Sequence, residues 1–370
     1  MSRSLIVKPV PLPLPPNALV AVDRAVAEIR RGGAVVVQAD DGAKALMMAA
    51  EGISAEALTR MARLSGTDPV VALSGQRAEV LGMTPDARSV VLISAAEPLS
   101  VNRITRLSDP LNPEKPDAGL TVRSTDIPDW AQGAVALAKL SRLLPAAVVA
   151  PTTAEMADCF HVSASDVLSY RPIAARSLKR VAEARVPLAD AEDARVVAFR
   201  PTDGGIEHLA IIVGHPDRDH PVLTRLHSEC FTGDLLGSLR CDCGDQLRGA
   251  ISQLSKSGGG VVLYLAQEGR GIGLINKLRA YELQDAGFDT LDANHQLGFD
   301  DDERTYLPAA EMLRLLGISQ VRLLTNNPAK VEGLARHGVQ VTERVPHVFP
   351  SNGHNARYLR TKATRSGHLF

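Results

Sequence analysis

Apolar runs rich in valine alternate with helix-like stretches along the first half of the chain. Residues 20–29 repeat apolar positions at helical spacing, Gly33 ends that helix, and residues 34–37 form an apolar run typical of a buried strand. Residues 131–143 have the same helical pattern and lead into a second apolar run at 147–149. This alternation predicts an α/β or α+β arrangement.

The second half continues the pattern and contains one especially clear unit. Residues 208–214 and 261–265 are apolar runs that predict strands. Residues 321–324 predict another strand, and Asn327 and Pro328 suit the N-cap and the first position of the helix that follows. A strand, a tight turn and a capped helix together predict a polar pocket at the turn.

A segment with mixed charges and no apolar face separates the two halves between residues 172 and 195. We place the domain boundary in this segment, which gives an N-terminal domain of residues 1–176 and a C-terminal domain of residues 177–370. The expected fold class is α/β (α+β), with two domains that each contain a mixed sheet and packed helices. A chain of 370 residues is long enough for both domains.

Composition narrows the class of protein. The chain is 45% hydrophobic and 22% charged, as globular proteins are, and no apolar run approaches the ~20 residues of a membrane helix. Its net charge of −1 argues against a general binder of nucleic acids or membrane surfaces. Four cysteines form no disulfide framework. We therefore expect a cytoplasmic protein without a nucleic-acid or membrane partner.

Three of the four cysteines lie close together, at Cys230, Cys241 and Cys243. Thiolates at this density in a reducing compartment favour Zn²⁺, and the glycines and charged residues around them argue against three buried apolar cysteines. Three ligands with an open fourth position would be the pattern of a catalytic zinc, which activates water. His227 is a rival fourth ligand.

A glycine-rich run at residues 268–273 follows a predicted strand. It is either a phosphate-binding loop, which Arg270 would favour, or a simple turn. Lys277 and Arg279 on the next predicted helix are by themselves typical of a solvated face, and Tyr281 is typical of a packing residue.

Two further charged segments have an ordinary interpretation and a functional one. Residues 300–304, three aspartates followed by a glutamate and an arginine, are typical of a solvent-exposed turn. Residues 346–370 contain no acidic residue, so their cations are either solvated or close over an anion; these include Arg357, Arg360, Lys362 and Arg365.

Five long motifs in the second half together resemble the GTP cyclohydrolase II family. They are residues 225–230, 238–244, 267–270, 293–299 and 323–328, and the similarity runs in unbroken order from about residue 178 to residue 370. The resemblance implies an enzyme that opens the imidazole ring of GTP and releases formate and pyrophosphate. The remaining diaminopyrimidine starts riboflavin biosynthesis. The family is commonly dimeric, so the resemblance also implies a homodimer.

The resemblance assigns roles to individual residues. Cys230, Cys241 and Cys243 correspond to the zinc ligands, and Mg²⁺ is expected with the triphosphate. The positions that correspond to GTP-binding residues are Arg225, Leu226, His227, Ser228, Glu229, Gln246, Glu268, Gly269, Arg270, Thr290, Thr325 and Lys330.

Three further positions correspond to catalytic residues of the family. Asp302 matches the proton acceptor, and Tyr281 matches the tyrosine implicated in ring opening. Arg304 matches a proposed nucleophile towards the α-phosphate. Because a guanidinium stays protonated, the alternative is that Arg304 only stabilises charge on the phosphate.

The first half resembles the 3,4-dihydroxy-2-butanone 4-phosphate synthase that precedes this domain in bifunctional riboflavin enzymes. The similarity lies in residues 33–51, 140–149 and 163–171. The acidic metal-binding motif of that family aligns with residues 40–45, its histidine loop with residues 128–133, and a later glutamate with Pro151.

Because most of those carboxylates and the histidine are absent, the resemblance implies a degenerate, structural first domain. Two alternatives stay open for the whole chain. It is a bifunctional enzyme that retains synthase activity, or a zinc-stabilised nucleotide-binding protein without catalysis.

Overall fold

The computed structural model describes residues 16–83, 90–112, 118–350 and 353. The four cations named in the basic tail lie outside these residues, so what the tail does stays an expectation. Among the helices of the described ranges, none has both the length and the apolar character needed to cross a bilayer.

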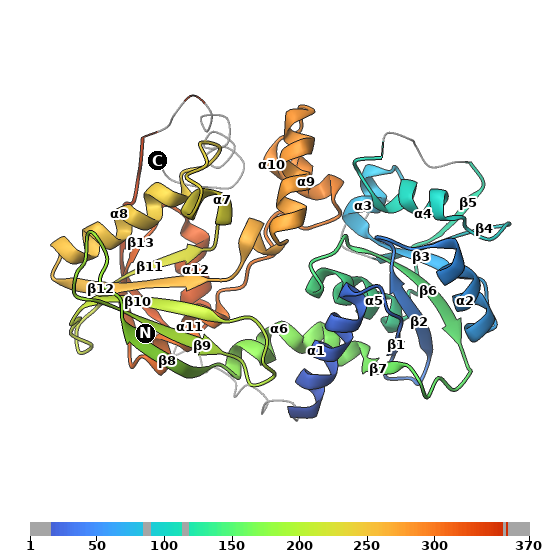
Figure 1. Cartoon of the computed structure of the whole chain (residues 1–370), viewed down its shortest axis with the longest axis horizontal. Coiled ribbons are helices and arrows are strands. Elements are labelled where there is room, and N and C mark those ends of the chain that lie inside the picture. The colour runs from blue at the N-terminus through green and yellow to red at the C-terminus, as the bar shows by residue number, and fades with distance from the viewer. Residues whose placement is uncertain (1–15, 84–89, 113–117, 351–352, 354–370) are drawn as a thin grey trace, which may run out of the picture.

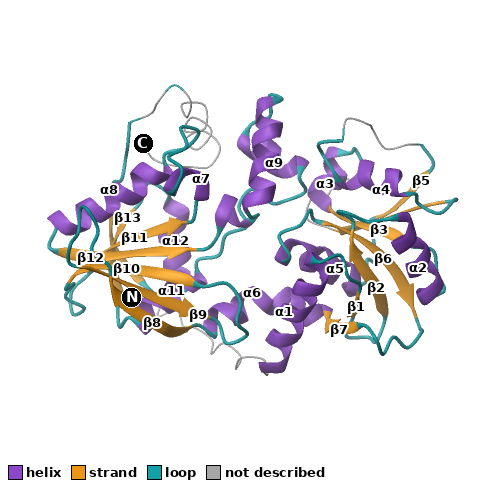
Figure 2. Ribbon diagram, viewed as in Figure 1, coloured by secondary structure: helices purple, strands orange, loops and turns teal. Residues whose placement is uncertain are grey.

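The first half contains one seven-stranded sheet, in the strand order β5-β4-β3-β6-β2-β1-β7 (Figures 1 and 2). Its pairs are antiparallel except for the parallel pair β1 and β7. The strands are β1 (Val35–Gln38), β2 (Lys44–Ala49), β3 (Val70–Ser74), β4 (Val90–Ala95), β5 (Leu120–Arg123), β6 (Ala146–Thr152) and β7 (Phe160–Ser163). The helices are α1 (Pro16–Arg30), α2 (Ala55–Ser65), α3 (Gly75–Val80), α4 (Val101–Ser108), α5 (Asp129–Leu140) and α6 (Ala164–Arg176).

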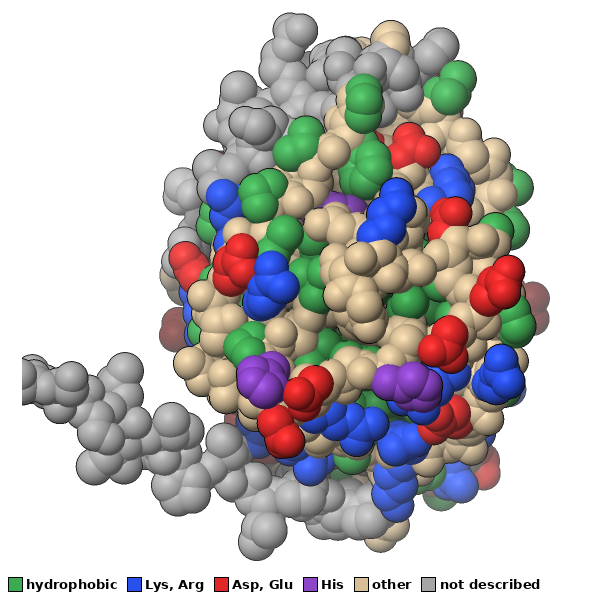
Figure 3. All heavy atoms as spheres, turned by 90° about the vertical axis from the view of Figure 1, so that its left-hand side faces the viewer, with side chains coloured by type: hydrophobic (Ala, Val, Ile, Leu, Met, Phe, Trp, Pro, Cys, Tyr) green, Lys and Arg blue, Asp and Glu red, His purple; other side chains and the backbone are tan. Residues whose placement is uncertain are grey.

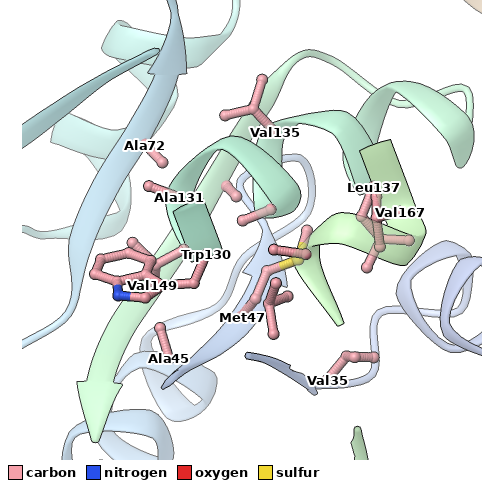
Figure 4. Packing of buried hydrophobic residues seen from close by; sticks show 14 of the residues in the cluster. Val35, Ala45, Met47, Ala72, Trp130, Ala131, Val135, Leu137, Val149 and Val167 are labelled. Atoms are coloured by element: carbon pink, nitrogen blue, oxygen red, sulfur yellow. The ribbon is translucent and has the colours of Figure 1, made fainter. Parts of the chain in front are cut away.

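Successive valines of β1 point to opposite faces of the first sheet, and helices cover both faces. Val35 and Val37 pack under α1, α5 and α6, whereas Val36 packs under α2, α3 and α4. Figure 4 shows the first of these cores, with Trp130 of α5 lying against the sheet. The helix and strands predicted between residues 20 and 37 and between 131 and 149 are confirmed.

The second half contains another seven-stranded sheet, in the order β14-β13-β11-β12-β10-β9-β8. The strands are β8 (Lys179–Arg185), β9 (Ala194–Arg200), β10 (His208–Gly214), β11 (Val222–Ser228), β12 (Gly259–Leu265), β13 (Gln320–Leu324) and β14 (Gln340–Val345). The helices are α7 (Phe231–Asp234), α8 (Cys243–Lys256), the 3₁₀ helix η1 (Glu268–Gly271), α9 (Leu274–Asp285), α10 (Thr290–Gln296), α11 (Leu307–Leu315) and α12 (Pro328–Arg336).

The predicted mixed sheets are therefore present in both halves. In the second sheet β11, β12, β13 and β14 pair in parallel, and β8, β9, β10 and β12 pair antiparallel. Asn327 caps α12 by accepting the amide hydrogen of Ala329, and Pro328 is the first helical residue, as predicted. Because β11, β12 and β13 are parallel, their carboxyl ends meet at one edge of the sheet, and polar side chains gather there.

Helices α9 and α10 lie between the two sheets (Figure 1). Leu144 of the first half packs in one buried cluster with Leu283 of α9, Leu297 and Phe299. The two halves therefore share an apolar contact.

The surface of the second half that faces away from the first half carries interspersed acidic and basic side chains (Figure 3).

Candidate active site and metal centre

The three clustered cysteines meet at the carboxyl end of β11. Cys230 precedes α7, Cys241 lies in the loop after it, and Cys243 begins α8. Their Sγ atoms all lie within 4.8 Å of one another, and those of Cys230 and Cys241 are 3.7 Å apart. Tetrahedral zinc with Zn–S bonds of about 2.3 Å places its sulfur ligands about 3.8 Å apart. The donor set therefore fits a metal such as zinc.

Gly233 makes room for this cluster. A Cβ atom at this position would lie 2.7 Å from Cys241 Sγ and 3.0 Å from Cys230 Sγ, closer than side-chain atoms approach each other. Hydrogen bonds from the neighbouring thiols and from Lys277 lower the pKa of Cys230 well below its ordinary value. A low pKa favours the thiolate, which is the metal-binding form of cysteine.

Lys277 is part of the site, so the expectation of a solvated face was wrong. Its ammonium donates to Cys230 Sγ at 3.0 Å, to Glu268 Oε1 at 2.9 Å and to Thr232 Oγ1 at 3.0 Å. Arg279, expected on the same face, instead pairs with Glu51 of the first half at 2.8 Å. Both cations lie on the sides of α9 that face these partners, whereas its Ile275 and Leu278 are exposed.

His227 lies beside the cysteines but outside their cluster. Its Nε2 donates to Asp234 Oδ1 at 3.0 Å, and Asp234 Oδ2 also accepts from the Tyr264 hydroxyl and from the Cys230 amide. Burial lowers the pKa of His227, which favours the neutral ring. Its Nδ1 is a buried acceptor without a hydrogen-bond partner in the described part of the chain.

One cavity next to the cysteines collects most of the residues expected at the site. The cavity is lined by Arg225, His227, Ser228, Glu229, Cys230, Cys241, Cys243, Gln246, Glu268, Gly269, Arg270, Tyr281, Thr290, Arg304, Thr325 and Lys330. Leu226 is not on the wall. Its side chain packs in the core of the second sheet, and its carbonyl accepts a hydrogen bond from Lys330 Nζ at 2.7 Å.

Two buried cations make one wall of the cavity positive. Arg225 donates to the Leu324 carbonyl at 2.9 Å and also contacts Gln246. Burial lowers the pKa of Arg225 to about 10, so the guanidinium is still charged at neutral pH. Lys330 lies in the first turn of α12, next to the turn after β13. This wall suits an anionic group.

The glycine-rich run forms a tight turn at the mouth of the cavity. Gly269 and Arg270 both have left-handed φ angles, 62° and 61°, which glycine adopts readily and arginine does not. Arg270 Nη1 donates to the Asp301 carbonyl at 3.2 Å, which ties the turn to residues 300–304. The run is therefore a turn whose arginine lies on the cavity wall.

Asp302 accepts two hydrogen bonds from one edge of the Arg304 guanidinium. Arg304 Nε is 2.8 Å from Asp302 Oδ1, and Nη2 is 2.6 Å from Oδ2. Burial alone would raise the pKa of Asp302, but the hydrogen bonds and charge of Arg304 lower it below its ordinary value. Arg304 lines the cavity, whereas Asp302 reaches it through Arg304.

Tyr281 lies close to the cysteines. The Arg240 guanidinium is 4.7 Å from the centre of the ring, and the Lys277 ammonium is 5.7 Å from it. Burial raises the pKa of Tyr281 to about 12, so its phenol keeps the proton at neutral pH. Tyr281 lines the cavity as well as packing against its neighbours.

The sequence analysis did not assign every residue of the cavity wall. Asn326 follows β13, where the strand, turn and helix predicted a polar pocket, and Asn327 was expected only as the N-cap of that helix. Asn294 lies in one of the five motifs and donates weakly to the carbonyls of residues 300 and 301. The sequence carried no signal for Lys277, because its partners come from two other segments.

Known proteins resemble the chain along most of its length. A profile of the GTP cyclohydrolase II family matches residues 179–346. A GTP cyclohydrolase-2 from Azospirillum brasilense is 55% identical and covers 97% of this chain and 96% of its own length. One from Xylella fastidiosa (strain 9a5c) is 38% identical and covers 97% of this chain and 89% of its own length.

Among solved structures, a two-domain 3,4-dihydroxy-2-butanone 4-phosphate synthase from A. baumannii covers 89% of this chain and 99% of its own. It is 18% identical, with a TM-score of 0.34. The two sequence relatives span nearly the whole chain at far higher identity, and the chain belongs to the GTP cyclohydrolase II family.

Proposed function

We propose that the protein is a GTP cyclohydrolase II, which opens the imidazole ring of GTP and releases formate and pyrophosphate at the start of riboflavin biosynthesis. One observation carries the proposal: a three-cysteine cluster and the buried cations Arg225 and Lys330 line the same cavity. A metal centre suits hydrolysis at the base, and a cationic wall suits the triphosphate. The expected GTP-binding residues that line this cavity are assigned to the nucleotide.

Zn²⁺ is the ion we assign to Cys230, Cys241 and Cys243, because three thiolates form a soft donor set. With an open fourth position, the ion would supply an acidified water molecule for hydrolysis at neutral pH. Mg²⁺ is assigned to the triphosphate, since hard oxygen ligands select it. His227 is assigned to the nucleotide rather than to the metal, because among the described residues only the three cysteines form the metal-binding group. Its Nδ1, which has no partner in that part of the chain, can receive a hydrogen bond from the base.

The roles of the three catalytic candidates follow from their positions. Tyr281, close to the cysteines, is assigned to ring opening, where its protonated phenol can donate to the reacting base. Arg304 is assigned to charge stabilisation at the α-phosphate rather than to covalent attack. Its partner Asp302 is ionised, and an ionised carboxylate favours the protonated guanidinium, which has no lone pair to attack with.

The first half is assigned to a degenerate synthase-like domain of residues 1–176, and the second to a cyclohydrolase domain of residues 177–370. The acidic motif of the synthases aligns with a segment whose Ala45 pairs with Pro151 inside the first sheet, and Trp130 of the histidine loop is buried in the core. Among the described residues, the three cysteines form the only His, Cys, Asp and Glu cluster that could hold a metal. These observations favour one catalytic activity over two.

A homodimer is proposed on the family resemblance and on an apolar surface beside the cavity. Leu235, Leu236 and Leu239 follow α7 and are exposed, as are Ile275 and Leu278 of α9. Exposed apolar groups of this kind are typical of interfaces. The mass in solution, measured by light scattering for the unmodified chain and for Leu236→Asp, tests this assignment.

The central experiment incubates the purified chain with GTP, Zn²⁺ and Mg²⁺ and measures formate and pyrophosphate. Both products are expected from the unmodified chain and from Cys159→Ser, because Cys159 lies in the first half outside the cluster. Cys241→Ser should lose zinc and formate release, since a hydroxyl is a poor ligand beside a thiolate. Binding of GTP without either product would support the non-catalytic alternative. Formation of butanone phosphate from ribulose phosphate and Mg²⁺ would establish the bifunctional one.

A further inference from the structure

Glu303 lies between Asp302 and Arg304 in sequence, but its side chain faces the first half of the chain. It is 8% exposed, and both of its carboxylate oxygens meet cations. Lys139 Nζ donates to Oε1 at 2.6 Å, and Arg171 Nη1 lies 3.4 Å from Oε2. Lys139 belongs to α5 and Arg171 to α6. Both cations therefore come from the half that holds neither the cysteines nor the cavity.

The backbone of Glu303 is held as firmly as its side chain. Arg171 Nη1 also donates to the Glu303 carbonyl at 2.8 Å, and the Glu303 amide donates to the Arg270 carbonyl at 3.1 Å. The Asp300 amide donates to Glu303 Oε1 at 3.2 Å. Amide, carbonyl and carboxylate of this one residue are thus all fixed.

The first half also contacts Asp300, the first residue of the segment 300–304. Lys139 Nζ lies 3.4 Å from Asp300 Oδ2, and Gln76 of α3 donates to Asp300 Oδ1. The second half contacts these residues as well: Asn294 reaches the carbonyls of residues 300 and 301 at 3.4 Å, His295 Nε2 lies 2.9 Å from Asp301 Oδ1, and Arg270 contributes the two contacts already described. The three aspartates are exposed, as the sequence predicted for a turn, whereas the Glu303 side chain is held by these contacts.

Glu303 is negatively charged in its contact with the two cations of the first half. Burial alone would raise the pKa of Glu303, but Lys139 and then Arg171 lower it, so the carboxylate is ionised at neutral pH. A neutral side chain of the same shape would remove the counter-charge of Arg171 and leave Lys139 with only Asp300, 3.4 Å away, which would loosen residues 300–304. Small displacements near reacting groups have large effects, since ~1 Å can cost about 100-fold in rate.

We propose that Glu303 is a positioning residue, by which Lys139 and Arg171 of the first half hold Asp302 and Arg304 in place at the cavity. This inference rests on the proposed function, because it gives the degenerate half a task in the cyclohydrolase reaction. Glu303 itself does not line the cavity that we assign to GTP. It acts on the substrate only through its two neighbours.

The test compares turnover in four proteins: the unmodified chain, Glu303→Gln, Arg304→Ala and the double variant. Glu303→Gln should lower kcat for pyrophosphate release about 30-fold and change KM for GTP less than threefold, because the binding cations Arg225 and Lys330 are untouched. In the Arg304→Ala background, the same change should have no further effect, since the group it positions is gone.

Three further variants make the outcome decisive. Lys139→Met should reproduce the kcat loss of Glu303→Gln, and Lys139→Arg should restore most of the rate by keeping the charge. Glu343→Gln breaks an ion pair with Arg322 on the second sheet and serves as the matched control with unchanged kcat. Zinc content and the unfolding midpoint are measured for each variant to show that it folds. If a Glu303 variant does not fold, Lys139→Met and Lys139→Arg carry the test in its place.

Two results would overturn the inference while GTP turnover by the unmodified chain upheld the proposed function. One is a normal kcat in both Glu303→Gln and Lys139→Met. The other is an equal loss with and without the Arg304 side chain, which would mean that Glu303 acts on folding or elsewhere in the site. If the unmodified, zinc-loaded chain released neither product, the proposed function would fail instead.

Discussion

The Lys277 ammonium lies between a thiol of the cysteine cluster and a buried carboxylate, 3.0 Å from Cys230 Sγ and 2.9 Å from Glu268 Oε1. Three thiolates around a divalent ion would leave a net negative charge, and a nearby ammonium would offset part of it. Glu268 in turn accepts a hydrogen bond from the Phe231 amide, directly after Cys230. Lys277 therefore connects the proposed metal centre to the chain that carries Cys230.

Lys277→Met keeps the length of the side chain and removes its charge and hydrogen bonds. We expect zinc affinity and kcat/KM to fall by about 10–100-fold, the usual effect of losing a partner of a metal ligand. Zinc competition with a chelator and steady-state GTP turnover measure the two effects. Lys256→Met at the exposed end of α8 removes the same charge away from the site and should change neither value. Full zinc affinity in Lys277→Met would contradict the role that we give to this ammonium.

The space that Gly233 leaves for the cysteines makes a second prediction. Gly233→Ala should displace Cys230 or Cys241, because its Cβ would lie 2.7 Å from Cys241 Sγ. The expected result is loss of bound zinc. Gly237 lies in the loop after α7, where an added Cβ would meet no atom within 4 Å, but its φ is 66°. Gly237→Ala should therefore cost about 1 kcal/mol of stability and keep its zinc. Equal zinc content in both variants would show that the cluster has more room than the structure gives it.

Local patterns predicted the elements that carry the site. The unit from β13 to β14 could be predicted because its cap, its first-turn proline and its apolar face all lie within about twenty residues of sequence, where propensity and periodicity act. Cys230, Cys241 and Cys243 could be predicted as a cluster because their residue type limits the chemistry. Such signals need no knowledge of the tertiary structure.

Contacts between distant segments could not be predicted in this way. Arg279 and Glu51 pair across 228 positions, and Lys139 meets Glu303 across 164. No pattern within one segment distinguishes a helix cation that meets such a partner from one that faces water. This is why the solvated face expected for Lys277 and Arg279 was wrong, and why the ion pairs of Glu303 could not be predicted.

The buried imidazole of His347 predicts how stability depends on pH. Burial lowers its pKa to about 4, with Arg225 adding to the effect, whereas an unfolded histidine titrates near 6.5. The unfolded chain thus binds more protons between these values, so this contribution is complete above pH 6.5 and is lost as the pH falls towards 4. The loss between pH 7 and pH 5 should be about 2 kcal/mol.

Denaturant unfolding of the unmodified chain and of His347→Gln at pH 7 and pH 5 measures this contribution. The variant can still donate towards the Gln246 carbonyl that His347 Nε2 contacts at 2.9 Å, but it does not titrate, so it should lose less stability on acidification. Parallel pH profiles for the two proteins would contradict a buried, neutral His347.

The different neighbours of Tyr281 and Arg304 predict that the two residues fail differently. Tyr281 lies beside the cysteines and Lys277, where we place the ring opening, whereas Arg304 is held by Asp302. Tyr281→Phe keeps the ring packed against Arg240 and removes only the hydroxyl, so formate release should fall about 100-fold while pyrophosphate release persists. Arg304→Ala should depress pyrophosphate release, and formate release only if the phosphate step comes first. Quenched-flow measurement of both products from each variant separates these outcomes. Equal loss of formate and pyrophosphate in Tyr281→Phe would mean that one group serves both steps, because a hydroxyl confined to the base end has no means of slowing chemistry at the α-phosphate.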